Sequence, residues 1–174
     1  MNDDLFAWKK FAKIGFLGIM PLVLIFVFFK ASPNNSVFYD VLILTQNMKV
    51  NLSSNNIPLS KSLGLYIVFG IFFAIYFVIK YGSLIKLKEN IITSIFILTR
   101  FIPFAVICFV YIYFMTFSDL DITKGNRLLK IVSSNDYLLL SYYLVSFVGV
   151  YCFSMLFILI AIKIPAAIKN KSQP

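Results

Sequence analysis

The chain contains no histidine, and only 13% of its 174 residues are charged. Histidine is the commonest general base and the commonest metal ligand in proteins, so its absence removes the usual basis for catalysis or metal binding. Soluble domains carry about a quarter charged residues. The low charged fraction therefore argues against an ordinary soluble domain.

Short motifs that mark active sites are also missing. The sequence has no glycine-rich phosphate loop, no CxxC pair, and no HExxH or GxSxG element. Its two cysteines, Cys108 and Cys152, both lie in apolar runs and are expected to pack there rather than to form a disulfide. The sequence therefore predicts a protein that is not an enzyme, with no catalytic residues, no metal and no cofactor.

Long apolar runs are what the chain has in abundance. The longest, from Tyr137 to Ile162, has no charged residue and exceeds the ~20 residues that a helix needs to cross a bilayer. Ser134, Asn135 or Asp136 can cap its first N–H groups. Together the apolar runs predict an all-α, polytopic membrane protein, a single domain with four transmembrane helices in a bundle. The spans are expected at about residues 11–29, 63–79, 101–117 and 137–162.

The third span has two alternatives, because Arg100 interrupts the apolar run from Ile91 to Phe117. If the helix is continuous, Arg100 lies about two turns inside it and must snorkel or find a partner. Alternatively, Ile91–Thr99 lies along the membrane interface and the span begins at Phe101. We favour the second alternative, in which Pro103 sits in the first turn, where its missing N–H costs little.

The positions of lysine and arginine predict the orientation. Ten of the 16 lie in the amino end, the segment 80–100 and the carboxyl tail, and the other six lie in the longer connections 30–62 and 118–136. By the positive-inside rule both termini are cytoplasmic and these two connections are outer loops. The sequence thus predicts a multi-pass protein of the bacterial inner membrane in contact with lipid. The same distribution accounts for the net charge of +9 without a nucleic acid partner.

Each outer loop contains a short feature of its own. Val37–Met48 is apolar but too short to cross a bilayer, which predicts a helix that lies on the surface or re-enters the membrane. In the second loop, Leu120–Thr123 and Asn126–Leu129 flank Lys124-Gly125, a pattern that suggests a small hairpin.

Two groups of residues are candidates for binding a partner. Small residues in the spans allow another helix to approach closely, although packing within the protein's own bundle explains them as well. Charged residues in the second outer loop are the ones that a docking partner would meet first, but exposed ion pairs contribute only ~0–1 kcal/mol. We therefore expect the spans to carry more of the recognition than the loop. The candidates are Gly70, Ala74, Ser146 and Gly149 in the spans, and Asp119, Asp121, Lys124 and Arg127 in the loop.

Several short motifs resemble those of one family. The marks are Ile14-Gly15 with Pro21-Leu22, Ser53-Ser54 with Pro58-Leu59, Asp119–Thr123 followed by Gly125 and Leu128-Leu129, and Ser134–Asp136 followed by Leu138–Leu140. In this order they resemble the inner-membrane immunity proteins that protect producer cells against pore-forming colicins of the colicin A and colicin B type. The resemblance extends nearly from end to end, and its most specific mark is in the second outer loop.

The resemblance implies a non-enzymatic inhibitor with four spans and both termini in the cytoplasm. Its partner would be the pore-forming domain of a cognate colicin, whose hydrophobic helices it would bind in the bilayer so that the channel fails to open. Two other classes remain as alternatives. One is a small integral-membrane subunit of a transport or secretion complex, and the other is a lipid-binding scaffold that uses the basic inner face.

Overall fold

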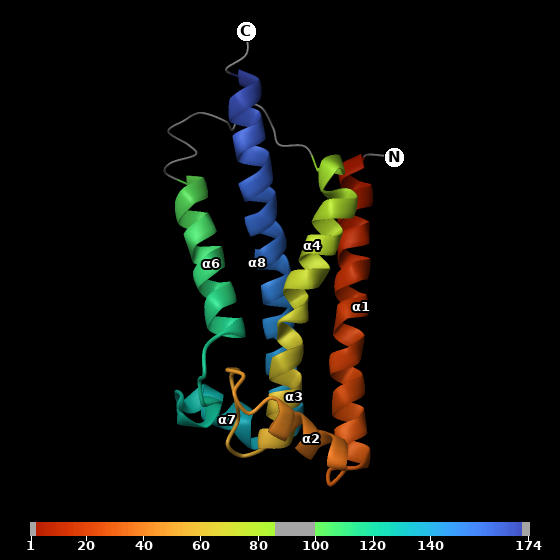
Figure 1. Cartoon of the computed structure of the whole chain (residues 1–174), viewed down its shortest axis with the longest axis vertical. Coiled ribbons are helices and arrows are strands. Elements are labelled where there is room, and N and C mark those ends of the chain that lie inside the picture. Colours follow the sequence, from red (N-terminus) through yellow and green to blue (C-terminus); the bar gives the residue numbers. More distant parts are fainter. Residues whose placement is uncertain (1–2, 86–99, 172–174) are drawn as a thin grey trace.

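The computed structural model describes residues 3–85 and 100–171, and within them the regular structure is helical (Figure 1). The predicted all-α class is confirmed for these residues. The long elements are α1 (Asp3–Ala31), α3 (Ile57–Ile67), α4 (Phe69–Tyr81), α6 (Ile102–Thr116) and α8 (Asp136–Lys171). The short ones are α2 (Ser36–Leu44), α7 (Arg127–Ser134) and the 3₁₀ turns η1 (Gly82–Leu84) and η4 (Ile122–Lys124).

Three of the described helices are long and apolar enough to cross a membrane. They are α1, the nearly continuous helical stretch Ile57–Leu84, which contains α3 and α4, and the Asp136–Ala166 part of α8. The apolar helix α6 has 15 residues, which at 1.5 Å per residue gives about 22 Å. It is therefore shorter than the ~30 Å hydrocarbon core. Its limits lie within one residue of the predicted segment 101–117, and Ile91–Thr99 lies outside the described residues.

The helices extend beyond the predicted spans because capping and charge, rather than hydropathy, determine where they end. Helix α1 already begins at Asp3, where Asp3 and Asp4 suit the positive end of the helix. Helix α3 begins at Ile57, inside the predicted outer loop, with the Asn56 side chain accepting a hydrogen bond from Leu59 N. Helix α8 continues through the predicted tail to Lys171.

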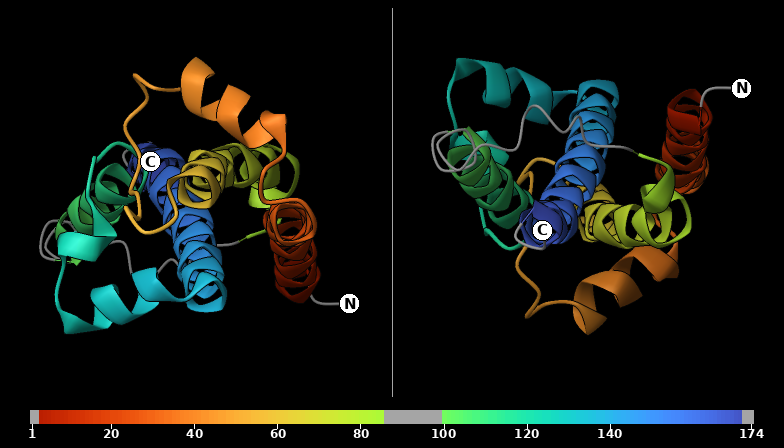
Figure 2. Two further views of the ribbon diagram at one scale, coloured as in Figure 1. Left: turned by 90° about the horizontal axis from the view of Figure 1, so that it is seen from below. Right: turned by 90° about the horizontal axis from the view of Figure 1, so that it is seen from above.

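Helix α8 is the centre of the bundle. Helices α4 and α6 lie on two sides of it, and α1 packs against both α4 and α8 (Figures 1 and 2). The core lies where α1, α3 and α8 meet. Its fully buried side chains include Leu22, Leu63, Tyr143 and Phe147.

The two ends of the bundle contain different parts of the chain. The start of α1 and the end of α8 lie at one end, whereas α2, α7 and the two long connections lie at the other, which we call the loop end (Figure 1). The predicted helix in the Val37–Met48 segment is confirmed for the part that α2 covers, up to Leu44: α2 lies at the loop end (Figure 2), where Phe38 packs edge-on against Phe29 with ring centroids 5.0 Å apart.

The predicted small hairpin around Lys124-Gly125 is wrong. Residues Ile122–Lys124 form the turn η4, in which the Asp121 side chain accepts a hydrogen bond from Thr123 N. Arg127–Ser134 forms α7, in which the Asn126 side chain accepts one from Leu129 N. Asp and Asn at these two positions cap helical turns, and this local hydrogen bonding replaces the strand pairing that the pattern suggested.

Candidate functional site

The polar segment Asn51–Asn56, which we call the 51–56 strap, joins the two long connections to each other. Leu52 N donates to Leu120 O at 2.9 Å, and Ile122 N donates to Leu52 O at 2.8 Å. These bonds form an isolated parallel bridge between Leu52 and Asp121. Two loops that are far apart in the sequence are therefore held together by their main chains.

Asp121 strengthens this junction with its carboxylate. Its oxygens accept hydrogen bonds from the Ser54 hydroxyl at 2.5 Å, the Thr123 hydroxyl at 2.5 Å and Thr123 N at 3.0 Å. The bonds from Ser54 and then Thr123 favour the charged form and lower the pKa of Asp121 to about 2. Lys124 Nζ lies 3.8 Å away. Asp121 is therefore already engaged within the loop end.

Other strap residues bind the elements around them. Ser53 Oγ donates to Ser133 O at 3.3 Å, and Asn55 Nδ2 donates to the same carbonyl at 3.2 Å, so the strap is tied to the end of α7. Asn51 Nδ2 donates to Phe114 O near the end of α6 at 3.3 Å. The Tyr143 hydroxyl of α8 donates to Asn51 O at 2.6 Å. Because Asn51 and Ser53 are buried, these bonds satisfy groups that would otherwise be costly to remove from water.

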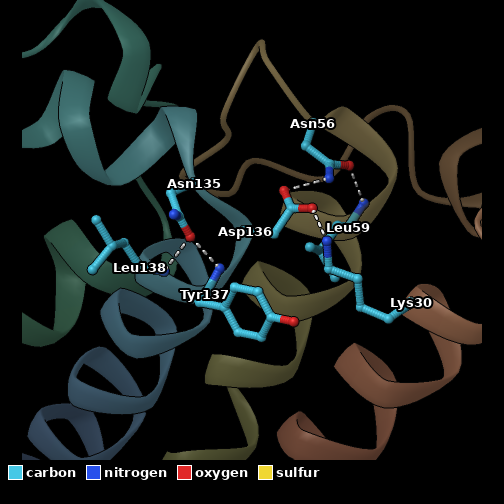
Figure 3. Close-up of polar contacts among 7 residues, drawn as sticks. All are labelled: Lys30, Asn56, Leu59, Asn135, Asp136, Tyr137 and Leu138. Carbon is cyan, nitrogen blue, oxygen red and sulfur yellow. Dashed lines mark hydrogen bonds and ion pairs between the residues drawn. The ribbon is translucent and has the colours of Figure 1, made fainter.

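A second polar cluster links the loop-end termini of three helices (Figure 3). Asp136 accepts hydrogen bonds from Lys30 Nζ at 2.6 Å and from Asn56 Nδ2 at 2.9 Å, which connects α8 to α1 and to the start of α3. Asn135 caps α8 by accepting from Tyr137 N at 2.9 Å and from Leu138 N at 3.3 Å. Among the three caps considered from the sequence, Asn135 is therefore the one whose side chain accepts from the first N–H groups.

Sequence reasoning missed the Lys30–Asp136 pair because its members are 106 residues apart. The available signal was a basic residue at the end of the first predicted span and an acidic residue at the start of the last. If both positions lie at the same membrane surface, opposite charges there can meet.

The four small candidate residues lie between helices of this chain. A Cβ on Gly70 would lie 3.3 Å from Phe147 O and 3.3 Å from Tyr151 N, so α4 directly contacts the α8 backbone there. A Cβ on Gly149 would lie 2.1 Å from the Tyr111 hydroxyl of α6. Ala74 and Ser146 are buried. In this structure the close approach that these residues permit is made by α4, α6 and α8 themselves.

The charged candidates have different environments from one another. Asp119, Lys124 and Arg127 are exposed at the loop end, whereas Asp121 is partly buried and hydrogen-bonded to Ser54. Asp121 therefore serves as an internal attachment point, while the other three charges of the second loop remain exposed.

Helix α6 has an outward apolar face that the sequence analysis did not single out. Of its residues only Cys108 and Thr116 are buried. The signal was present, because a helix that is apolar all round either lies in a core or faces lipid. Its exposed side chains include Phe104, Val106, Ile107, Phe109, Val110, Tyr113 and Phe114.

Among the described residues, no group of three or more His, Cys, Asp or Glu side chains is placed to hold a metal ion. The arrangement is that of a helical protein with three described helices able to cross a membrane, closed at one end by hydrogen-bonded loops. No protein-family model matches the chain, and neither a curated protein nor a solved structure matches it.

Proposed function

We propose that the protein is an immunity protein of the bacterial inner membrane, which binds the pore-forming domain of a cognate colicin in the bilayer and prevents channel opening. The observation that carries this proposal is the meeting of three motifs on which the family resemblance rests. Ser53-Ser54, Asp119–Thr123 and Ser134–Asp136 are separate in sequence, yet each contributes to the hydrogen-bonded loop end. Their contact supports the interpretation that they form one structural unit.

In the proposed topology α6 is the third of four crossings, both termini are cytoplasmic and the loop end is periplasmic. The placement of the start of α1 and the end of α8 at the same end of the bundle supports an even number of crossings (Figure 1). The excess of basic residues toward that end supports a cytoplasmic location for it. Residues flanking α6, including Phe101 and Phe117, lengthen its apolar stretch toward both surfaces.

Within this proposal the loop end and α6 have different roles. The strap and the Asp136 cluster hold the loop end in one conformation, which reduces the entropy lost when a partner docks. Exposed Asp119, Lys124 and Arg127 steer the encounter, since rim charges affect association rates more than affinity. The outward face of α6 offers the larger contact area to toxin helices in the bilayer, where packing rather than the hydrophobic effect drives association.

Expression in sensitive cells, followed by challenge with a panel of pore-forming bacteriocins, tests the function. We expect survival against one toxin or a few related ones, and no protection against nuclease-type colicins, whose killing does not depend on a membrane channel. Sensitivity to every pore-forming toxin, at a membrane level verified with a tag, would contradict the proposal. Isolation of the protein in a fixed multi-protein assembly would then favour the transport or secretion subunit.

A second experiment separates the two proposed roles. Phe109→Ala and Val106→Ala truncate exposed side chains of α6, while Lys124→Ala and Arg127→Ala remove exposed charges from the loop end. We expect the α6 pair to lower protection at matched protein levels and the charge pair to have the smaller effect. Loss of protection with the charge pair alone would assign recognition to the loop.

The topology has its own test, in a background where Cys108 and Cys152 are replaced by alanine. Lys124→Cys and Lys9→Cys each place a thiol at an exposed position, at opposite ends of the bundle. A membrane-impermeant thiol reagent added outside is expected to label position 124 and not position 9. The reverse pattern would invert the proposed orientation.

A further inference from the structure

A pocket of about 620 Å³ lies at the loop end between α3, α6 and the chain before the 51–56 strap. Its walls include Leu65 of α3, Val68 between α3 and α4, Tyr113 of α6, Phe117 just after α6, and Met48. Met48, Tyr113 and Phe117 are each about half exposed, so the pocket opens to the outside of the bundle. It runs from the polar loop end inward along two apolar helices.

Lys61 is a buried cation on the same side of α3 as this pocket. It is only 5% exposed, and it precedes the pocket residue Leu65 by four positions, which places both on one face of α3. Its Nζ donates to the carbonyl oxygen of Met48, itself a pocket residue, at 2.5 Å.

In the described part of the chain, no carboxylate oxygen lies within 4.0 Å of Lys61 Nζ. A buried ammonium group is costly unless it is paired with an anion, and the Met48 carbonyl satisfies one of its three donors. Lys49, which is exposed, lines the same pocket and adds a second positive charge. The pocket lining therefore combines apolar walls with one cation, Lys49, and a second cation, Lys61, lies next to this lining through its bond to the Met48 carbonyl.

We propose that this pocket binds one anionic phospholipid. The headgroup phosphate lies at Lys61 and Lys49, and an acyl chain follows Leu65, Val68 and Tyr113 toward the middle of the bundle. The charge complementarity favours phosphatidylglycerol over the zwitterionic phosphatidylcholine, and the apolar walls favour a lipid over a free phosphate ion. The inference does not depend on the proposed immunity function, because it requires only that this face of α3 and α6 contacts lipid.

Native mass spectrometry of the full chain, purified in a mild detergent and supplied with dioleoylphosphatidylglycerol, tests the site. We expect the wild-type protein to retain one lipid and Lys61→Met to bind it about tenfold less tightly, because one charge-assisted contact is lost. Methionine keeps the unbranched apolar stem. Lys130→Met, at an exposed position of α7 away from the pocket, is the matched control and should bind as the wild type does. Equal retention by wild type and Lys61→Met would overturn the proposal.

Two further questions are whether the acyl chain occupies the apolar part of the pocket and whether the bound phosphate belongs to a lipid. Separate variants and competitors test them. Val68→Trp fills the apolar part of the pocket without changing charge, and Lys49→Met removes the exposed cation. Both variants should weaken lipid retention. If Lys61→Met is not monodisperse on gel filtration, these two variants alone test whether the pocket binds lipid. Unchanged retention in both variants would refute the site.

A large excess of inorganic phosphate should not displace the lipid, and full displacement would identify a free-anion site instead. Equal retention of phosphatidylcholine would refute the proposed charge recognition.

Discussion

Helices α4 and α6 pack on the same helix, α8, but they differ at the glycine where each approaches it. On the α4 side, Gly70 lies directly against the backbone of α8, and Ala74 one turn later is fully buried. On the α6 side, the Tyr111 side chain lies over Gly149 and packs against Phe153, with ring centroids 4.6 Å apart. At Gly70, α4 thus lies against the α8 backbone, beside side-chain contacts such as that of Phe73 with Phe147, whereas at Gly149 an aromatic side chain of α6 fills the space between the helices.

The difference predicts where the bundle can adjust. A backbone contact between two helices has no side chain that can move aside, so added volume there must separate the helices. An aromatic side chain can change its rotamer and leave both helices in place. The α4–α8 contact is therefore the fixed part of the bundle and the α6–α8 contact the adaptable part. Under the proposed function, α6 is the side at which a partner helix would be accommodated.

The strongest test of this comparison is Gly70→Leu. Its side chain would meet Phe147 O and Tyr151 N of α8, so we expect a loss of about 1–3 kcal/mol in the free energy of unfolding, measured by thermal unfolding in detergent. Ile79→Phe adds volume on the same helix at a position that is 81% exposed, and it should be nearly silent. Similar losses for the two variants would show that α4 is not held by a backbone contact.

Asn51→Ala is expected to have the next largest effect and to act on the α6 side. Asn51 donates to Phe114 O and accepts from the Ser118 hydroxyl at 2.8 Å, so the loss of both partly buried bonds should cost about 1–2 kcal/mol. Hydrogen exchange should increase in α6 and stay unchanged in α4. Gln46→Ala, at an exposed position nearby, is the control. Faster exchange in α4 to the same extent would mean that the loop end holds the two helices alike.

Gly149→Ala should cost less than about 1 kcal/mol, although its added Cβ would lie only 2.1 Å from the Tyr111 hydroxyl. That atom is the far end of a side chain that can rotate, and alanine is a better helix former than glycine by about 1 kcal/mol. Combining it with Tyr111→Phe, which removes the nearest atom, should cost less than the sum of the two single changes. Strict additivity in this cycle would show that Tyr111 does not take up the strain.

How much of this could be predicted from the sequence depends on the range of the interaction. The apolar runs and the cap at Asn135 are local patterns, so the helices and the all-α class could be predicted. The contacts of Gly70 and Gly149 depend on which helices become neighbours, which hydropathy does not specify. The hairpin failed because the local side-chain bonds of Asp121 and Asn126 outcompeted strand pairing.

The smallest expected effect is a pH dependence of hydrogen exchange in α6, which comes from the hydrogen bonds of Asp121 at the loop end. The pKa of Asp121 is lowered to about 2 from an ordinary value of 3.8, first by the Ser54 hydrogen bond and then by Thr123. A group whose pKa is lower in the folded state stabilises that state fully above its unfolded value and loses this effect as the pH falls toward the folded value. Between about pH 4 and pH 2 the loop end should therefore loosen, and exchange in α6 should rise before exchange in α4 does. Asp121→Asn lacks this titration and should show a smaller change in α6 exchange across the same range. If the variant and the wild type respond identically to pH, Asp121 is not the group that couples the loop end to α6.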